Sequence, residues 1–274
     1  IKGKALEVPV WNLLGGKKRD RVRIYAHAHD APRAREMVDR GYTALKTGGI
    51  ENCVEAVDSI RREVGLEVDL MVDVHGPPWM PPRDAIALGR ELENYRLLFY
   101  EDPVAPENVD SLARVAAAVD LPIAAGERHA ASWGVRELSE REIIDVVQPD
   151  TGRAGGLAQM KKIAALAEAY NRPLICHNVD PALMPLVHLH LWAACPSCLY
   201  PQEYFGEDEH PLRDQTPVLR DPIQVVDGHI QVPDGPGLGI EIDEEMVRSI
   251  AAGTAPCSQN RRCQSGALGS AEHC

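Results

Sequence analysis

Short apolar runs alternate with amphipathic stretches along most of the chain. The runs are six to nine residues long and rich in β-branched side chains, which predicts strands at 21–28, 43–48, 67–75, 96–103, 122–127, 145–150, 173–178 and 198–205. The stretches between them carry apolar residues at helical spacing, which predicts helices at 31–41, 51–65, 82–95, 106–120, 134–143, 156–170 and 181–195.

Strands that alternate with helices of this length form βαβ units and a parallel sheet. Eight such strands within about 190 residues predict an α/β fold, a TIM-like (β/α)7β barrel over residues 21–205. The rival architecture is a doubly wound Rossmann sheet. It requires a glycine-rich turn after an early strand, but "LLGGKK" precedes the first strand. We therefore predict a barrel with residues 1–20 as a lead-in segment.

Two further segments follow the barrel. Residues 206–245 contain "PIQVVDGHIQVPDGPGLGIEID", whose alternation and Asp-Gly pairs predict a short hairpin that caps the scaffold. Residues 246–274 lead into a Ser-, Gly- and Cys-rich tail, and we predict that this segment is disordered.

Composition narrows the possible functions. The chain has 274 residues, 45% of them hydrophobic, so it can bury a large core, and its net charge of −12 argues against a nucleic-acid partner. No apolar run reaches the roughly 18–20 residues of a membrane span, and the N-terminal stretch lacks the pattern of a signal peptide. These features predict a cytoplasmic protein that contacts no membrane.

Cysteine usage favours reduced thiols. The count of seven is odd, and Cys53 and Cys176 fall inside predicted regular elements, so a disulfide framework is not expected. The pair in "CPSC", residues 195–198, has the spacing of a zinc or redox motif, but no second pair completes it. We expect a structural role there.

Ionisable residues recur near the ends of seven strands, at intervals of 23 to 28 residues: Lys46, Asp73, Glu101, Glu127, Asp150, His177 and Glu203. One acid at a strand end is usually a solvated turn residue. A series of seven is different, because barrel active sites are built at the C-terminal ends of the strands. The spacing predicts that all seven converge on one mouth.

Three carboxylates in this series, Asp73, Glu101 and Glu127, end neighbouring strands. They would repel one another unless a cation lay among them, and oxygen ligands suit Mg²⁺. His75 follows Asp73 by two residues, so it points the same way along a strand and lies within reach for proton transfer.

Asp150 and His177 end adjacent strands and are predicted to form a dyad, in which the carboxylate orients the imidazole as a general base. The alternative is a hydrogen bond from His177 to a backbone carbonyl. The other histidines, such as His27, His29, His188 and His190, are assigned structural roles.

The ordered motifs "FYEDP", "AAGE", "QPD", "AGG" and "CHN", together with the carboxylate trio, resemble the enolase superfamily. The resemblance covers roughly residues 1–245. Within the superfamily it is to the mandelate racemase/muconate lactonizing enzyme branch, most like the D-galactonate dehydratase group of acid-sugar dehydratases.

The resemblance implies that Asp73, Glu101 and Glu127 bind Mg²⁺, and that the metal binds the carboxylate of a sugar acid. It also implies that His177, oriented by Asp150, removes the proton α to that carboxylate. The chain would then be a hydro-lyase with a 2-keto-3-deoxy acid as its product.

On the other side of the mouth, the resemblance implies that Glu203 hydrogen-bonds to the enediolate and that His75 protonates the departing 3-hydroxyl. Lys46 would stabilise the bound carboxylate, unless it is an ordinary strand-end lysine. Racemases of this branch carry Lys-x-Lys here, but this chain has Gly48 at the second position, which favours elimination.

Three further residues are candidates for substrate binding: Arg128, Trp79 and Asn178. Loop packing would equally explain Trp79, and an ion pair with the carboxylates would explain Arg128.

Family members carry an N-terminal α+β capping domain of about a hundred residues, which closes over the mouth. The chain begins at the barrel lead-in, so this domain is expected to be missing. A missing cap would favour one alternative to a dehydratase, a non-catalytic or truncated barrel. The other alternative is a racemase, epimerase or cycloisomerase of the same scaffold. A zinc hydrolase fits poorly, because zinc prefers N and S ligands. The resemblance also predicts a homo-oligomer.

Overall fold

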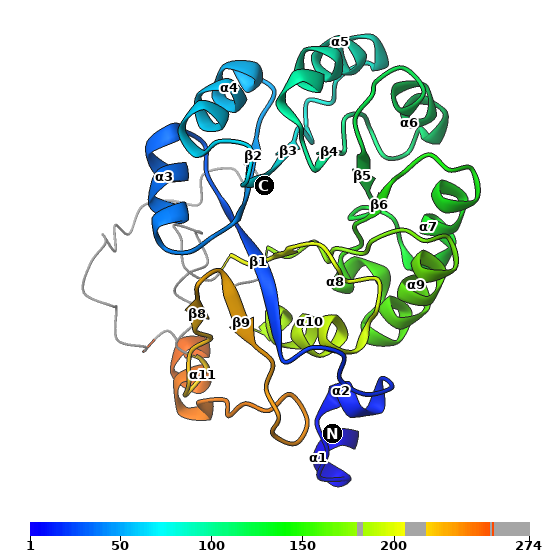
Figure 1. Cartoon of the computed structure of the whole chain (residues 1–274). Coiled ribbons are helices and arrows are strands. Elements are labelled where there is room, and N and C mark those ends of the chain that lie inside the picture. The colour runs from blue at the N-terminus through cyan, green and yellow to red at the C-terminus, as the bar shows by residue number, and fades with distance from the viewer. Residues whose placement is uncertain (180–182, 206–217, 253, 255–274) are drawn as a thin grey trace.

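The computed structural model describes residues 1–179, 183–205, 218–252 and 254. Strands near the centre are surrounded by helices (Figure 1). The central strands are β1 (Arg21–His27), β2 (Ala44–Gly48), β3 (Asp69–Asp73), β4 (Phe99–Glu101), β5 (Ile123–Ala125), β6 (Val146–Val147) and β7 (Gln202–Glu203). The predicted α/β barrel architecture is confirmed.

The helices between these strands are α3 (Ala31–Asp39), α4 (Cys53–Val64), α5 (Pro82–Leu92) with the 3-10 turn η1 (Glu93–Tyr95), α6 (Val109–Ala116), α7 (Ala131–Glu140), α8 (Thr151–Ala154), α9 (Leu157–Ala169) and α10 (Leu183–Ala194). Side-chain caps set some of their starts: Asp30 accepts from Arg33 N, and Asn108 from Ser111 N. The short helix α8 was not predicted. It begins because Asp150 caps Arg153 N.

The strands pair in parallel and in chain order from β1 to β6, and β7 pairs with the other edge of β1. The predicted strand at 173–178 differs: it makes only isolated bridges, Val147 to Leu174 and Asp150 to His177. Between this segment and β7, the side chain of Gln202 makes hydrogen bonds that a neighbouring strand's backbone would otherwise make. Its amide accepts from Cys176 N at 3.1 Å and donates to Leu174 O at 3.0 Å. A continuous backbone ladder therefore does not close the barrel.

Two apolar layers follow from the alternation of side chains along the strands. One fills the barrel interior and consists of Tyr25, Ala44, Met71, Phe99, Ala124, Val146 and Ile175. The other lies between the strands and the helices and includes Ile24, Leu45 and Val72, the immediate neighbours of interior residues.

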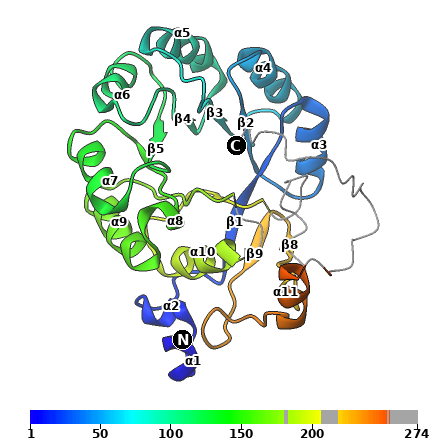
Figure 2. The ribbon, with the colours of Figure 1, turned by 180° about the vertical axis from the view of Figure 1, so that it is seen from behind.

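The chain ends add smaller elements. Seen from behind, α2 (Val10–Leu13) lies beside α10, and α1 (Lys2–Ala5) lies beyond α2 (Figure 2). The predicted hairpin is present as β8 (Val225–Val226) and β9 (His229–Gln231), and β9 pairs antiparallel with β1. Its turn is Asp227-Gly228, both at positive φ, as a tight hairpin requires.

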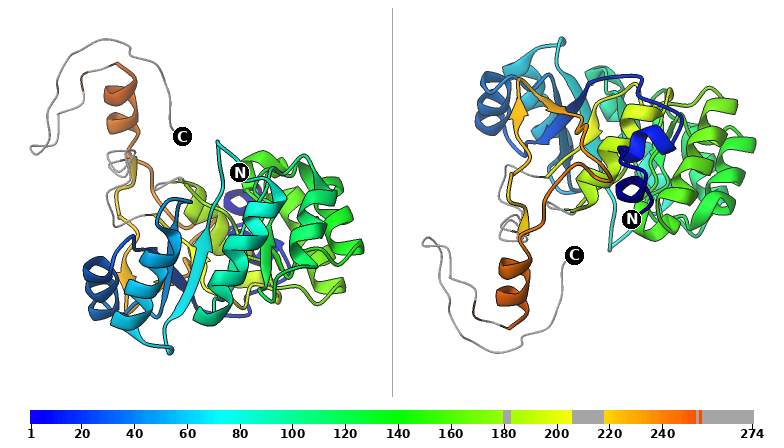
Figure 3. Two further views of the ribbon diagram at one scale, coloured as in Figure 1. Left: turned by 90° about the horizontal axis from the view of Figure 1, so that it is seen from above. Right: turned by 90° about the horizontal axis from the view of Figure 1, so that it is seen from below.

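Helix α11 (Glu244–Ala251) projects from the body of the molecule (Figure 3). It occupies the start of the segment predicted to be disordered, because Asp243 caps Met246 N and two acidic residues fill the first turn. Residues 255–274 of that segment, and 206–217 of the preceding one, lie outside the described residues.

The described cysteines, Cys53, Cys176, Cys195 and Cys198, are buried free thiols, in agreement with the prediction. The other three lie outside the described part of the chain. Among the helices that the structure describes, none combines the length and apolar character needed to cross a bilayer.

Candidate active site

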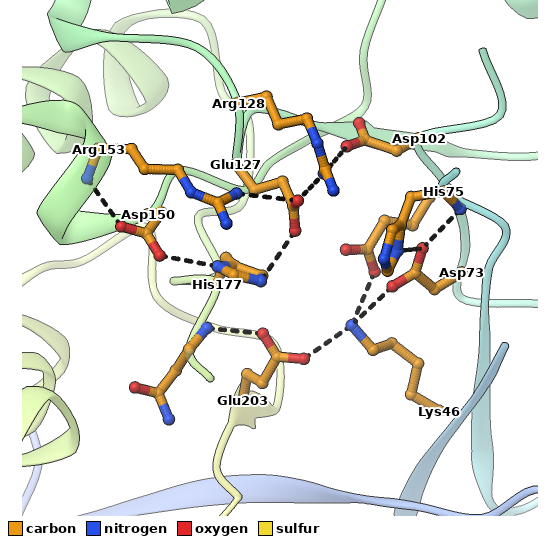
Figure 4. Close-up of polar contacts among 12 residues, drawn as sticks. Lys46, Asp73, His75, Asp102, Glu127, Arg128, Asp150, Arg153, His177 and Glu203 are labelled. Atoms are coloured by element: carbon orange, nitrogen blue, oxygen red, sulfur yellow. Dashed lines mark hydrogen bonds and ion pairs between the residues drawn. The ribbon is translucent and has the colours of Figure 1, made fainter. Parts of the chain in front are cut away.

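The predicted polar residues meet at one end of the barrel, where Lys46 joins three carboxylates (Figure 4). Its Nζ lies 2.7 Å from Glu203 Oε1, 3.0 Å from Glu101 Oε2 and 3.4 Å from Asp73 Oδ2. All four side chains are nearly inaccessible to solvent. Three of the seven predicted strand-end residues, far apart in sequence, therefore meet at the ammonium group of a fourth, Lys46.

Burial and repulsion give the carboxylates around Lys46 different proton affinities. Burial alone would raise the pKa of Asp73, but Lys46 and His75 hold it at about 2. Burial and the charge of Asp73 raise the pKa of Glu101 to about 8. Burial would lower the pKa of Lys46, yet Glu101 and Glu203 keep it well above its usual value. One cation is therefore shared by more acids than it can neutralise.

His75 contacts Asp73 directly, as their two-residue spacing predicts. Its Nδ1 lies 2.7 Å from Asp73 Oδ1, and its backbone N–H donates to the same oxygen at 3.1 Å. The imidazole is 43% exposed, so its far edge is open to the mouth. Such a histidine can exchange protons with a ligand bound there.

A second group is centred on Glu127, which follows β5. Its Oε1 accepts from Arg153 at 3.0 Å and contacts Arg128, and its Oε2 lies 2.9 Å from His177 Nε2. The side chain is only 3% exposed. Two guanidinium groups and an imidazole therefore hold this carboxylate.

The predicted dyad is present. His177 Nδ1 lies 2.8 Å from Asp150 Oδ2, while the other oxygen of Asp150 caps α8 through Arg153 N. Burial would raise the pKa of Asp150, but the hydrogen bond to His177 lowers it, so the carboxylate is charged. This contact fixes the imidazole ring with Nε2 towards the mouth.

Glu203 lies between the two groups. Its Oε2 accepts from the backbone N–H of Asn178 at 2.7 Å. Burial would raise the pKa of Glu203, but Lys46 holds it well below the usual range. A carboxylate in this state accepts hydrogen bonds. It donates one only after it is protonated.

The three predicted metal ligands do not form a common cluster. Among the described residues, no group of three His, Cys, Asp or Glu side chains is arranged to hold a metal ion. Asp73 and Glu101 face Lys46, whereas Glu127 faces His177. Their chemistry nevertheless suits a hard cation: all are oxygen donors, and buried Glu101 Oε1 has no hydrogen-bond partner in the described structure.

The predicted substrate-binding residues lie around this site. The guanidinium of Arg128 stacks over the ring of Trp79 at 5.1 Å and lies 3.6 Å from Asp102 Oδ2, besides its contact with Glu127. Burial and Asp73 raise the pKa of Asp102 to about 6. Asn178 is 1% exposed and contacts Glu203 through its backbone.

The sequence profile of a family described as enolase C-terminal domain-like matches residues 29–246. The chain belongs to this enolase family. The match includes every strand-end residue of the site from Lys46 to Glu203, and it confirms the predicted resemblance.

The relatives of this enolase-like chain include enzymes with different reactions. It is 36% identical over 269 residues to a D-galactonate dehydratase of Xanthomonas axonopodis pv. citri, covering 90% of this chain and 70% of that protein. It is 32% identical over 268 residues to a D-galactarolactone cycloisomerase of Agrobacterium fabrum, with the same two coverages. The predicted hydro-lyase class agrees with the names of the dehydratases.

A solved structure gives the same result for the fold. It is described as a mandelate racemase/muconate lactonizing enzyme-like protein from Roseovarius sp. TM1035, and superposes with a TM-score of 0.83 at 34% identity. The alignment covers 91% of this chain and 69% of that one. The chain spans from 54% to 72% of the length of the curated relatives that it matches.

Three residues of this enolase-like site were not identified from the sequence. Arg153 follows Asp150 in the unpredicted helix α8, and Asp102 stands next to Glu101. His27 ends β1 and lies 3.4 Å from Glu203. Of these three, only His27 could have been predicted from the sequence. It lies at the end of the first strand, just as each of the seven predicted residues lies near the end of its own strand.

Proposed function

We propose that this chain is the catalytic barrel, residues 21–205, of a Mg²⁺-dependent sugar-acid dehydratase. The observation that carries the proposal is the His177–Asp150 pair, which faces an excess of buried carboxylates at one barrel mouth. A fixed imidazole beside a strongly acidic pocket suits proton removal next to a carboxylate, and the named dehydratases among the relatives support this chemistry.

Asp73, Glu101 and Glu127 are the proposed ligands of Mg²⁺. Bound there, the metal would hold the substrate carboxylate and stabilise the negative charge that develops when the α-proton leaves. The raised pKa of Glu101 and the unpartnered Glu101 Oε1 support a cation at this place.

His177 is the proposed base, and Nε2 is the atom that takes the α-proton. Asp150 holds Nδ1–H and so directs the lone pair of Nε2 to the mouth. In the structure, Nε2 instead lies against Glu127 Oε2 at 2.9 Å. The base must therefore separate from Glu127 before it can act, and Arg128 and Arg153 remain to hold that carboxylate.

His75 is the proposed acid for the departing 3-hydroxyl, because its ring is half exposed and anchored on Asp73 by Nδ1. Lys46 would attract the substrate carboxylate. Since Lys46 keeps Glu203 ionised, we assign Glu203 to accept hydrogen bonds from substrate hydroxyls, rather than donate to the enediolate. Arg128, Trp79 and Asn178 are the proposed walls of the substrate pocket. Homo-oligomerisation stays a prediction.

A cycloisomerase is the second candidate, because a D-galactarolactone cycloisomerase is 32% identical to the chain. Both reactions need a positioned base. They differ in the group that leaves the β-carbon after the α-proton is removed: a hydroxyl leaves as water in the dehydration, whereas the ring oxygen of a lactone leaves in the ring opening.

The experiment that tests the proposal incubates the purified chain with Mg²⁺ and a library of mono- and diacid sugars and their lactones. Semicarbazide detects 2-keto-3-deoxy products, and chromatography detects ring-opened lactones. We expect one or two sugar acids to give a 2-keto-3-deoxy product, with His177→Asn inactive and His229→Asn, a substitution outside the site, fully active. A 2-keto-3-deoxy product formed from a lactone but from no free sugar acid would favour the cycloisomerase. Ring opening without a keto product is hydrolysis, and that outcome, or a folded chain that forms no product, would refute both.

A further inference from the structure

The first strand completes the ring of polar strand ends. His27 is the last residue of β1 and is paired in register with Lys46 on β2, while Tyr25 is paired with Glu203 on β7. Side chains two apart on a strand share a face, so Tyr25 and His27 both point into the barrel. His27 therefore occupies the eighth position of the mouth, between Lys46 and Glu203.

The contacts of His27 favour a role in this site over simple core packing. Its Nε2 lies 3.4 Å from Glu203 Oε1, the same oxygen that accepts from Lys46 at 2.7 Å. Nε2 is buried and makes no hydrogen bond within the described residues, although Glu203 Oε1 lies within ion-pair distance. The ring stacks on Phe205 with centroids 3.9 Å apart and an interplanar angle of 17°. Stacking fixes the ring plane and keeps Nε2 close to Glu203.

The charge of His27 is also defined by its surroundings. Burial lowers its pKa, with Lys46 acting in the same direction, although the contact with Glu203 opposes them. The imidazole is therefore neutral near pH 7 and carries a single N–H. A neutral donor can hold Glu203 without adding a second positive charge beside Lys46.

We propose that His27 is a positioning residue for the proposed dehydration, which acts by donating from Nε2 to Glu203 Oε1. With Asn178 N–H on Oε2 and both His27 and Lys46 on Oε1, the carboxylate has one orientation. Lys46 is then kept between Glu203 and the carboxylates of Asp73 and Glu101. The 3.4 Å contact is long, as such contacts often are before a substrate binds.

Two substitutions separate the hydrogen bond from the stacking. His27→Phe keeps a flat ring against Phe205 but has no donor, whereas His27→Gln places an amide N–H near the position of Nε2. This proposal rests on the proposed function, so we expect His27→Phe to lower kcat about ten- to hundredfold with KM changed less than about threefold. We expect His27→Gln to recover most of that loss, and His29→Gln, two residues along in exposed chain, to match the parent.

A second measurement does not depend on turnover. Nitrogen-15 NMR of the histidine-labelled chain, with His27 assigned by His27→Phe, should show a neutral ring protonated at Nε2, and Glu203→Gln should shift that resonance. A His27 resonance unaffected by Glu203→Gln overturns the proposal, and so does undiminished turnover in His27→Phe. If the parent chain turns over no sugar acid, the proposed function fails, and the NMR result alone decides the role of His27.

Discussion

The same strands contribute to two regions of the barrel interior. One is the charged mouth, and the other is the apolar interior layer described above, here called the floor. Along a strand, the two regions are only two residues apart. Six of the seven floor residues are followed two positions later by a polar residue on the same face, in the pairs Tyr25 and His27, Ala44 and Lys46, Met71 and Asp73, Phe99 and Glu101, Val146 and Gln148, and Ile175 and His177. The exception is Ala124, which is followed by Gly126. Five of the polar members are buried and the sixth, His27, is 16% exposed, so depth along the strand, more than exposure to water, separates the two chemistries.

The difference teaches what each region contributes. The floor gains free energy by removing apolar surface from water and by close packing. The mouth buries several carboxylates against one lysine, an arrangement that costs desolvation and is better explained by function than by stability. Substitutions in the mouth should therefore reduce activity, whereas substitutions in the floor should reduce stability.

The largest effect is expected at the base. His177→Asn removes the proton acceptor while Asp150 remains in place as the cap of α8, so we expect kcat to fall about 10⁴-fold. The melting temperature should stay within a few degrees of the parent. Keto-acid formation by the semicarbazide assay, together with calorimetry, measures both. A variant that melts much earlier would mean that this part of the mouth is also structural.

The floor counterpart is Phe99→Ala, two residues before Glu101. Phe99 is fully buried inside the barrel, so its truncation leaves a cavity and should destabilise the fold by about 3–5 kcal/mol. Urea unfolding measures this loss. Activity at a temperature where the variant is folded should fall far less than in His177→Asn; an equal loss would show that floor packing sets the catalytic geometry.

The third prediction concerns the loss of stability at low pH, and it involves a residue outside the mouth. His188 on α10 is buried against Thr151, with 2.6 Å between Nε2 and Thr151 Oγ1, and burial lowers its pKa to about 3. Below the unfolded-state pKa of about 6.5, His188 binds a proton in the unfolded chain but stays neutral in the folded chain. The stabilisation is therefore complete above pH 6.5 and decreases as the pH falls towards 3.

We expect His188 to account for a loss of about 3 kcal/mol between pH 7 and pH 4. Urea unfolding at the two pH values measures it. His188→Gln, which keeps a hydrogen-bonding group but binds no proton, should show a smaller pH dependence than the parent. His229→Gln, a partly exposed histidine, should leave the slope unchanged, and equal slopes in all three proteins would contradict the assignment.

The smallest effect separates two carboxylates of the mouth. Glu101 has its pKa raised to about 8, so Glu101→Gln replaces a group that is largely neutral at pH 7, and stability should change by less than about 1 kcal/mol. Asp73 is charged, with a pKa of about 2, so Asp73→Asn removes a partner of Lys46 and should cost about 1–2 kcal/mol.

The same pair tests the metal. Both substitutions should abolish the rise in melting temperature that Mg²⁺ is expected to produce in the parent. A Mg²⁺-dependent rise that survives in both variants would place the cation elsewhere.

The stability comparison without metal has its own contrary outcome. Equal destabilisation by Glu101→Gln and Asp73→Asn would show that Glu101 is charged before the metal binds.

The sequence determined the barrel and the composition of its mouth. Strand and helix periods are local properties of the chain, and each βα unit places its strand end at the same edge. Residues such as Asp73, Glu101 and His177 were therefore predictable from their spacing, and the Asp227-Gly228 turn was predictable from its Asp-Gly pair. The two-residue step from Met71 to Asp73 also fixed which side chains share the interior.

Only the tertiary structure decided which of these groups touch. The position of Lys46 among Asp73, Glu101 and Glu203, and of Glu127 against His177, depends on side-chain reach across the barrel. The Gln202 side chain that joins β7 to the segment at 173–178 also has no local signature. Such contacts join residues 25 to more than 150 positions apart, and their partners are chosen by the energy of burying charge, which a one-dimensional pattern does not contain.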